Sequence, residues 1–347
     1  MAKYLSQIET PTESQVIYYP QAVDTAIQQA AIMWPAEELG VEEDEQDFRH
    51  NLTEGERFAV LGLQRYLSKI EATIGGDDFW GGRIQRMFPR PEIIRAASII
   101  NAVENTSHAP FYRIGNEVIG VATDEFYEEF KTIPIFNEHI QYIVKQSKSK
   151  CKLTATAALT FLEGVPLFAA FGFFKSFGVR GHNLISHFIA GIDGSAKEET
   201  FHSMFSAWIV NQCIKERLDA ENMTLAQLDK FHKTLKKMAR KVYKHELGII
   251  DYIYSHQGHT IRTVTKRELQ HFVRDRVNAV LSFFGLPPMF KAKVGVISKW
   301  FYDQLNAYKF QDFFATTQLQ YRRNWKKHEL VFCMEVANEY KEFYANV

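Results

Sequence analysis

Residues 153–174 read LTATAALTFLEGVPLFAAFGFF, and this stretch decides the fold. A helix through it has apolar side chains on nearly every face, which is typical of a central helix buried on all sides. Glu163 is its only acid, and the stretch contains no basic residue. A buried carboxylate costs several kcal/mol unless it is paired, protonated or bound to a metal ion. Glu163 therefore needs a partner from elsewhere in the chain.

Three further segments with helical periodicity carry acids on faces that we expect to be buried. They span residues 54–75, 91–112 and 183–218, and they carry Glu71, Glu104 with His108, and Glu199 with His202. Two helices that each offer one carboxylate, and two that each offer a carboxylate and a histidine, supply the ligands of a dinuclear centre in a four-helix bundle. Oxygen-rich ligands with two imidazoles favour iron or manganese. The sequence therefore predicts a dimetal site in an all-α bundle.

The rest of the chain predicts one helical domain over residues 1–347. Further helices are expected near 23–34, 125–146, 225–256 and 263–284, with an interruption of the 183–218 helix at 191–194 and a solvated acidic connection at 42–47. The ends are expected to be peripheral, with an extended N-terminal arm over about residues 1–22. The amphipathic C-terminal tail, about 315–347, suits docking into a partner's groove, and folding back onto its own bundle is the alternative.

Composition excludes several classes of function. The 41 basic and 41 acidic residues balance, so no net charge favours nucleic acid or an anionic membrane. Three widely spaced cysteines cannot form a disulfide framework or a cysteine-based zinc site. The N-terminus has no apolar stretch of the signal-peptide kind. We expect a cytoplasmic protein without a nucleic-acid or membrane partner.

Short motifs surround the predicted ligands. They are Tyr66-Leu-Ser-Lys-Ile-Glu71, His108-x-x-x-Tyr112, the lone Glu163, Glu199-Thr-Phe-His202, and Asp312-Phe-Phe314 before the tail. In spacing and order these motifs resemble the small, radical-generating subunit of class I ribonucleotide reductase, over roughly Trp34 to Phe314. The resemblance implies a ferritin-like helical bundle with a dinuclear metal site in its core.

The resemblance also implies a function. The dimetal centre would activate oxygen to generate a radical, stored on Tyr112, that passes to a large catalytic subunit for the reduction of ribonucleotides to deoxyribonucleotides. Trp34 and Glu198 resemble the family's electron relay. The resemblance implies two iron ions, with Mn/Fe and Mn/Mn as alternatives. It also implies a homodimer that binds the large subunit through its C-terminal tail.

The sequence departs from the family at the second ligand helix. The residue three before His108 is Asn105, and the acid is one further back, at Glu104. We prefer Glu104 as the ligand, because a spacing of four also places both side chains on one face. Pro110 has no amide hydrogen and predicts a local bulge, which can absorb one residue.

Several features of the sequence admit more than one interpretation. Gly164 and Pro166 predict local unwinding after Glu163, and Ser195 and Glu198 have the spacing of a capping box, which would make Glu198 a helix cap. The tail offers Tyr321, Tyr340 and Tyr344 as relay residues. The first rival function is a ferritin-like dimetal oxidase or monooxygenase acting on a small organic substrate, which predicts an open pocket at the metals. The second is a metal-free interaction protein, which predicts acids that are exposed or paired with Lys or Arg.

Overall fold

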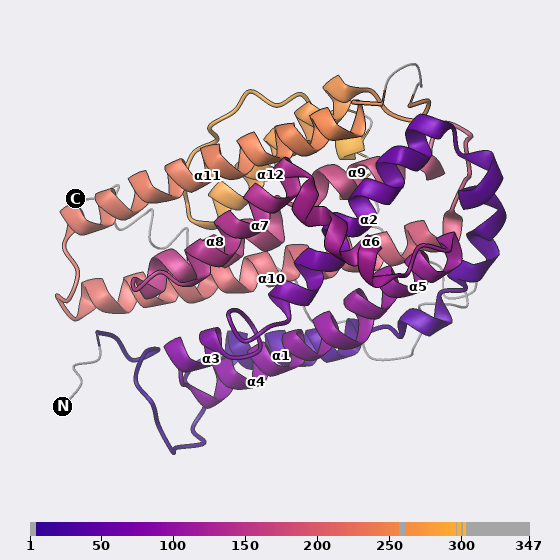
Figure 1. Cartoon of the computed structure of the whole chain (residues 1–347). Helices are drawn as coiled ribbons and strands as arrows, with labels where there is room; N and C mark the ends of the chain where they lie inside the picture. The colour runs from indigo at the N-terminus through magenta and orange to yellow at the C-terminus, as the bar shows by residue number, and fades with distance from the viewer. Residues whose placement is uncertain (1–4, 257–260, 296, 300, 303–347) are drawn as a thin grey trace.

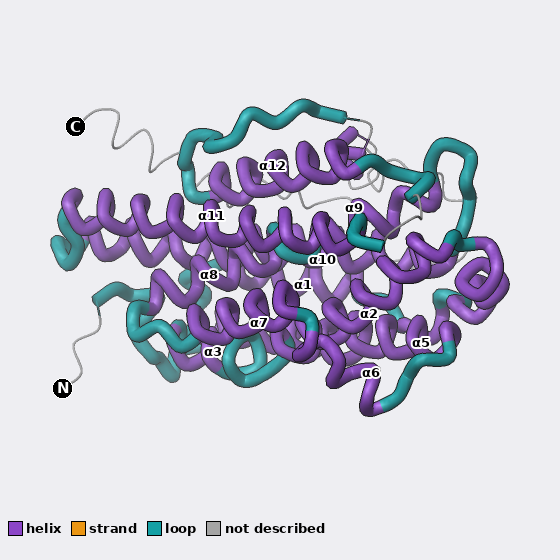
Figure 2. The backbone as a smooth tube through the Cα atoms, turned by 45° about the horizontal axis from the view of Figure 1, so that its top comes forward, coloured by secondary structure: helices purple, strands orange, loops and turns teal. Residues whose placement is uncertain are grey.

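The computed structural model describes residues 5–256, 261–295, 297–299 and 301–302. Within these residues the fold is built from helices and contains no strand (Figure 2). The α-helices are α1 (Pro20–Ile32), α2 (Glu54–Ile74), α3 (Arg83–Met87), α4 (Pro91–Val103), α5 (Ala109–Ile119), α6 (Asp124–Glu128), α7 (Pro134–Ser147), α8 (Lys152–Gly164), α9 (Phe168–Lys175), α10 (Ser186–Asp219), α11 (Leu225–Ile253) and α12 (Lys266–Phe283). A π-helical turn, Glu104–His108, joins α4 to α5.

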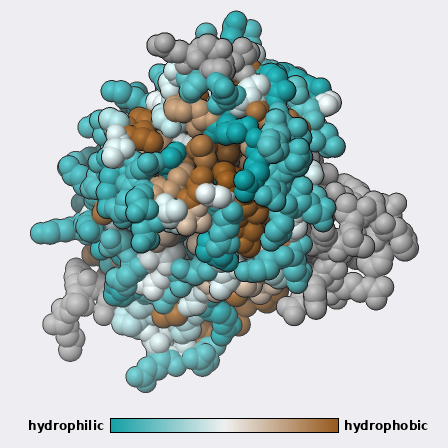
Figure 3. Space-filling model, turned by 45° about the vertical axis from the view of Figure 1, so that its right-hand side comes forward, coloured by the Kyte–Doolittle hydropathy of each residue, from teal (hydrophilic) through white to brown (hydrophobic). Residues whose placement is uncertain are grey.

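Four long segments form the centre of the bundle: α2, the α4–π–α5 segment, α8 and α10. Helix α8 packs lengthwise on α10, α2 packs on α5 and the π-turn, and α11 with α12 covers α8 and α9 (Figure 1). Helix α1 lies along α4. Nearly all side chains of α8 and α9 are buried, so the central position predicted from their composition is confirmed. The face seen in Figure 3 is mainly hydrophilic, with hydrophobic side chains visible where the surface is hollowed.

Local sequence signals explain most helix ends. Thr53 with Glu56 forms a capping box at the start of α2, and Thr265 with Glu268 does the same for α12. Helix α8 ends at Gly164 and α9 begins at Phe168, so the unwinding predicted from Gly164 and Pro166 is confirmed.

Three sequence-based expectations about the elements were wrong. Residues 125–146 form no single helix, because a 3₁₀ turn at Glu129–Thr132 separates α6 from α7, which begins at Pro134. The acidic stretch 42–47 is not simply solvated: Asp44 Oδ2 accepts a hydrogen bond from the Phe188 amide at 2.7 Å, and Asp47 Oδ2 accepts one from the Ile185 amide at 2.7 Å. These carboxylates cap the start of α10 from a distant part of the chain.

The third wrong expectation is the interruption at 191–194, since α10 is continuous there. The two glycines instead allow close packing of aromatic rings. A Cβ on Gly191 would lie 2.3 Å from Phe111, and one on Gly194 would lie 2.7 Å from Nε1 of Trp34. Because Ser195 and Glu198 lie inside this helix, Glu198 is not part of a helix cap.

Residues 5–19 form no helix, but α1 begins at Pro20, inside the predicted arm of about 1–22, and the arm is firmly attached. Glu9 is buried and accepts hydrogen bonds from Nε and Nη2 of Arg217 on α10, at 2.9 and 2.7 Å. The predicted tail, 315–347, with Tyr321, Tyr340, Tyr344 and the Asp312-Phe-Phe314 motif, lies outside the described residues. One segment, Lys152–Gly178, has the length and composition of a membrane span, but 94% of its apolar window is buried inside the protein, as in a core helix.

Candidate metal centre

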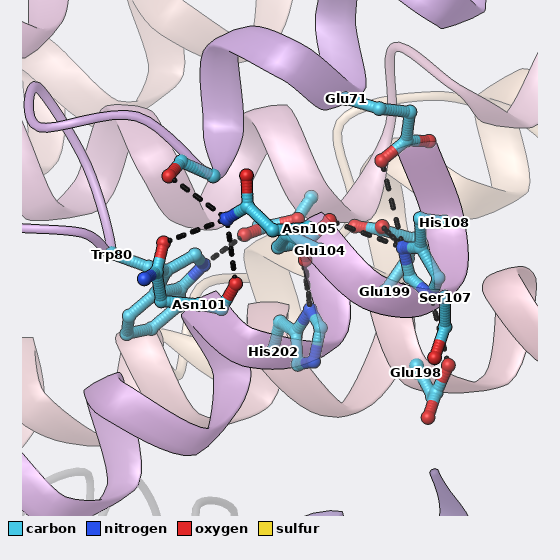
Figure 4. Close-up of polar contacts among 12 residues, drawn as sticks. Glu71, Trp80, Asn101, Glu104, Asn105, Ser107, His108, Glu198, Glu199 and His202 are labelled. Carbon is cyan, nitrogen blue, oxygen red and sulfur yellow. Dashed lines mark hydrogen bonds and ion pairs between the residues drawn. The ribbon is translucent and has the colours of Figure 1, made fainter. Parts of the chain in front are cut away.

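The structure brings all six predicted ligands together in the core of the bundle. Figure 4 labels five of them: Glu71, Glu104, His108, Glu199 and His202. They form two overlapping groups, within each of which the candidate ligand atoms lie within 4.8 Å of one another. The first group is Glu71, Glu104, His108 and Glu199, and the second is Glu104, Glu163, Glu199 and His202. All six side chains have no exposed surface. Glu104 and Glu199 belong to both groups, so they lie where the two groups overlap.

The π-turn decides which residue of the second ligand helix faces this cluster. The amide of Ala109 bonds to the carbonyl of Glu104, five residues back, so one extra residue is accommodated before His108. Glu104 is therefore buried in the cluster, whereas Asn105 is exposed. The Asn105 amide donates to the carbonyl oxygens of Asn101 and Gly75, at 2.7 and 3.2 Å (Figure 4). The bulge predicted from Pro110 is confirmed, and Glu104 is the acid that faces the cluster.

Glu104 spans the two histidines. Its Oε1 lies 2.9 Å from Nδ1 of His202, and its Oε2 lies 3.1 Å from Nδ1 of His108. The same Nδ1 of His108 lies 3.1 Å from Glu199 Oε1 and 3.5 Å from Glu71 Oε2. Both imidazoles thus direct Nδ1 toward the carboxylates, and their ring centres lie 6.2 Å apart. The two histidines belong to different groups, so each would hold a different one of two ions.

Glu198 connects His108 to Trp34. His108 Nε2 lies 2.8 Å from Glu198 Oε2, and the same oxygen accepts a hydrogen bond from Trp34 Nε1 at 2.9 Å. The Trp34 ring also stacks on His108, with ring centres 5.8 Å apart. The backbone of Trp34 is fixed as well, because its carbonyl accepts a hydrogen bond from Ser107 in the π-turn at 2.6 Å. The residues named as a relay therefore form one continuous set of contacts.

Sequence analysis missed two residues that hold the ligands. Gln29 on α1 accepts a hydrogen bond from His202 Nε2 at 2.9 Å, and its amide donates to Glu198 Oε1 at 2.8 Å. Trp80, in the loop after α2, donates its indole N–H to Oε1 of Glu163. Both side chains are completely buried. Such partners fix the orientation of ligand side chains. For Gln29 the only signal in the sequence was its position on the inner face of an amphipathic helix. Trp80 lies in a loop beside glycines, and nothing in that sequence indicates a contact with a ligand.

The crowding of acids shifts their protonation equilibria. Burial raises the pKa of Glu71 to about 8, and burial together with neighbouring carboxylates raises the pKa of Glu199 well above its usual value. Burial acts to raise the pKa of Glu104 too, but the two imidazoles beside it lower that pKa overall. Conversely, burial acts to lower the pKa of His108, yet the surrounding carboxylates raise it overall. Without a cation the cluster retains protons that a metal ion would displace.

The unpaired atoms of the cluster fit a pair of divalent cations. Buried atoms without a hydrogen-bond partner include both carboxylate oxygens of Glu71 and Glu199, Oε1 of Glu104, Oε2 of Glu163, and Nδ1 of His202. Buried polar groups are rarely left in this state. In the described part of the chain the ion pairs of these four acids are with His108 and His202. Four carboxylates would balance two divalent ions, and this donor set suits iron or manganese.

Tyr112 lies on α5, one turn after His108, and is completely buried. Its hydroxyl has no hydrogen-bond partner. Burial, then the charge of Glu71, raises the pKa of the phenol well above its usual value, while His108 and the nearby Ser195 hydroxyl act in the opposite direction. Tyr112 is therefore a neutral phenol in dry surroundings beside the cluster.

Comparison with known proteins supports one family. The family model described as "Ribonucleotide reductase, small chain" matches residues 13–296. The chain is 23% identical over 334 residues to "Probable ribonucleoside-diphosphate reductase small subunit 048L" of Invertebrate iridescent virus 3, and the match covers 88% of this chain and 82% of the viral protein.

Solved structures with low sequence identity share the fold. Dimanganese(II) NrdF of Streptococcus sanguinis aligns with a TM-score of 0.71 at 16% identity, covering 84% of this chain and 98% of that one. The ribonucleotide reductase R2 subunit of Clostridium botulinum aligns with a TM-score of 0.68 at 19% identity, covering 83% and 89%. An R2-like ligand-binding oxidase with a Mn/Fe cofactor aligns with a TM-score of 0.60 at 17% identity, covering 76% and 93%.

Proposed function

The chain belongs to the family of ribonucleotide reductase small chains, and from this premise we propose which of its residues carry out the family's function. It is the radical-generating small subunit of a class I ribonucleoside-diphosphate reductase, an oxidoreductase with a dinuclear metal site, and it works with a large catalytic subunit. The observation that carries the assignment of residues is the convergence of six completely buried ligand side chains next to a buried tyrosine.

We assign the metal ligands as Glu71, Glu104, Glu163 and Glu199 with His108 and His202. When bound, the two ions would supply the one-electron oxidising power that oxygen activation provides. Two iron ions remain our proposal, with Mn/Fe and Mn/Mn as alternatives. The carboxylates neutralise the ions, and Glu198 and Gln29 fix the histidines, so that each imidazole presents Nδ1 as a donor.

Tyr112 is the proposed site of the stored radical. Because its phenol is neutral at rest, it must give up the hydroxyl proton together with an electron. Its complete burial keeps solvent and reductants away from the ring. The hydrogen-bonded set His108–Glu198–Trp34 supports a relay, because it leads outward from the cluster. Trp34 is fixed at its indole N–H by Glu198 and at its backbone carbonyl by Ser107.

The assembly and location of the protein complete the proposal. We propose that it forms a homodimer, that its C-terminal tail docks on the large subunit, and that one of Tyr321, Tyr340 and Tyr344 in that tail receives the oxidising equivalent. We also propose that it works in the cytoplasm, supplying deoxyribonucleotides for DNA replication. The balanced composition supports a partner that is neither nucleic acid nor membrane.

A substrate-oxidising function fits the site less well. A small organic substrate must reach the metal ions, and an open pocket would leave exposed surface on their ligands. All six ligand side chains instead have no exposed surface. The convergence of the four acids also contradicts a metal-free interaction protein.

Metal analysis combined with electron paramagnetic resonance tests the proposal. The protein is loaded with iron or manganese, exposed to oxygen and compared with Tyr112→Phe and Tyr127→Phe, the latter removing a hydroxyl near Asn116 rather than at the cluster. We expect about two ions per chain and a tyrosyl signal that is unchanged in Tyr127→Phe. In Tyr112→Phe the line shape of the wild-type signal should be absent. An unchanged line shape in Tyr112→Phe would overturn the assignment of Tyr112, and no metal in the wild type would overturn the ligand set.

A further inference from the structure

A second buried polar cluster lies where α2 meets α7 and α11. Tyr66 on α2, His139 on α7, and His245 and Glu246 on α11 are all buried. His139 and His245 pack with ring centres 4.5 Å apart. None of these side chains belongs to the candidate metal groups. Burying four titratable groups costs free energy, and apolar packing alone gives no reason to place them here.

The core of this cluster is a tyrosine–histidine pair. The Tyr66 hydroxyl lies 2.5 Å from Nδ1 of His139 and 3.3 Å from the carbonyl oxygen of Pro166. An O–H donor normally sits about 2.7–2.8 Å from its acceptor, so the Pro166 carbonyl is the weaker partner. In the tautomer of His139 that carries its hydrogen on Nε2, the phenol proton is directed at Nδ1. Burial, together with His245 and Lys241, lowers the pKa of His139 well below its usual value, so this ring is a neutral acceptor.

The two buried tyrosines thus differ in one chemical respect. The hydroxyl of Tyr112 has no hydrogen-bond partner, whereas that of Tyr66 faces an imidazole. A resting phenol has a pKa of about 10. A phenol that has lost an electron is far more acidic. A neutral imidazole within hydrogen-bond reach can take that proton as the electron leaves. Tyr66 has this arrangement without any help from a metal ligand.

The surroundings of Tyr66 are dry and aromatic. Its ring stacks on Phe136 with ring centres 5.1 Å apart, and Phe136 in turn packs on Tyr252 at 4.7 Å. Tyr66 and Phe136 have no exposed surface. The carboxyl group of Glu246 accepts a hydrogen bond from the Ala169 amide at 2.8 Å, and burial raises its pKa well above the usual value. A radical on Tyr66 would face no solvent and no added anionic charge.

The pair is also connected to the metal centre through two ligand-bearing segments. Tyr66 precedes Glu71 by five residues on α2. Its hydroxyl contacts Pro166, in the break between α8 and α9, three residues after Glu163. Short covalent and hydrogen-bonded paths therefore lead from both Glu71 and Glu163 to the Tyr66 ring.

We propose that Tyr66 and His139 form a second redox site, which holds the oxidising equivalent when Tyr112 does not. The Tyr66 O–H bond breaks: one electron reduces the one-electron oxidant generated at the dimetal centre, and the proton forms an N–H bond at Nδ1 of His139. The products are a neutral tyrosyl radical and an imidazolium, and the oxidant gains the electron. This role in the metal-loaded protein rests on the proposed function. The ease with which the Tyr66–His139 pair is oxidised is independent of that function.

Photo-oxidation of the metal-free full-length protein tests the pair independently of the metal centre. Tris(bipyridine)ruthenium(III), produced by a light flash with a sacrificial acceptor, serves as the one-electron oxidant, and the long-lived tyrosyl signal is measured after freezing. The variants are Tyr66→Phe, His139→Gln, and Tyr142→Phe as a control whose ring packs on His245. His139→Gln keeps an oxygen acceptor but no base. We expect the long-lived signal to disappear in Tyr66→Phe, to fall roughly tenfold or more in His139→Gln, since a positioned base contributes about 10²–10⁴-fold, and to persist in Tyr142→Phe.

The loaded protein gives the second measurement. After oxygen exposure, Tyr112→Phe should show a tyrosyl signal of different line shape, which disappears when Tyr66→Phe is added. If the photo-oxidation signal is lost in Tyr66→Phe but the metal-loaded wild type forms no radical, the Tyr66–His139 redox pair would stand and the proposed function would be refuted. The second redox site would be overturned if the loaded protein shows the Tyr112 signal while the long-lived photo-oxidation signal is unchanged in both Tyr66→Phe and His139→Gln. Metal content, measured in every variant, should stay at the wild-type value, and a loss would make Tyr66 a structural support of Glu71 instead.

Discussion

Two neighbouring residues, Glu104 and Asn105, have opposite predicted effects on metal binding. Glu104 is completely buried and lies 2.9 Å from His202 and 3.1 Å from His108, whereas Asn105 is exposed and bonds to backbone carbonyls. We compare Glu104→Gln, which keeps the size of the side chain and removes its charge, with Asn105→Ala. Only the first should weaken binding of the ions.

The magnitude follows from the charge balance. In the proposed site four carboxylates would neutralise two divalent ions, so Glu104→Gln would leave one positive charge uncompensated among side chains with no exposed surface. An uncompensated buried charge costs about 3–5 kcal/mol. At about 1.4 kcal/mol per tenfold change, affinity should fall roughly 10²- to 10⁴-fold. Asn105→Ala should change the free energy of binding by less than about 0.5 kcal/mol, as surface substitutions do.

Manganese(II) titration under anaerobic conditions, with the bound ions counted after equilibrium dialysis, measures both variants. Urea unfolding in the presence of a chelator is the control for folding, and both metal-free variants should remain folded because His108 can release its proton when the charge of Glu104 is removed. Weak binding by Asn105→Ala together with normal binding by Glu104→Gln would refute the placement of the ligands and with it the role of the π-turn.

Three further predictions concern the surroundings of the site. Because burial raises the pKa of Glu71 to about 8 in the metal-free protein, its carboxyl group must lose a proton on binding, so manganese affinity should rise from pH 6 to pH 8, and a flat titration profile would contradict this linkage. Gln29→Ala removes the acceptor of His202 and should lower metal affinity about 10–100-fold, while the partly exposed Gln28→Ala serves as its control in the same dialysis assay. Arg217→Met removes both guanidinium hydrogen bonds to the buried Glu9 carboxylate, which keeps the Lys152 ammonium 3.2 Å away, and should cost about 2–3 kcal/mol of the free energy of unfolding. Because Arg217 holds the pKa of Glu9 down at about 2, against burial that acts to raise it, this loss should be complete above about pH 4.5, where an unfolded Glu ionises, and should shrink as pH falls toward 2. An equal loss at low pH would show that Arg217 acts through packing alone.

The convergence of the six acids and histidines could be predicted because several of these residues violate the pattern around them. A glutamate in an apolar helix, such as Glu163, has a large cost, and that cost is visible in the sequence without knowledge of the fold. Pro110 was informative for the same reason, since a helix interior does not tolerate proline without a local change. Both signals are local, and both led to the correct structural feature.

The residues that were missed carry no such local cost. Gln29 is a neutral amide on an amphipathic helix, equally acceptable at a surface, and only the contact with His202 gives it a role. Gly191 and Gly194 were ambiguous in a related way, because glycine either interrupts a helix or admits a close neighbour. Which of these applies depends on Trp34 and Phe111, which lie far away in the sequence.

The π-turn explains how a chain with an extra residue before His108 can still present a complete site. In a straight α-helix each added residue rotates everything after it by about 100°, so an extra residue before His108 would turn His108 and Tyr112 away from the buried face of the preceding turns of α4. The five-residue bond from Ala109 to Glu104 absorbs that rotation and excludes Asn105 instead. Pro110 lowers the cost of this arrangement, since it has no amide hydrogen to lose from the regular pattern. The departure from the family's usual spacing and the bulge are thus one feature, and the bulge keeps Glu104, His108 and Tyr112 aligned with the buried face of α4.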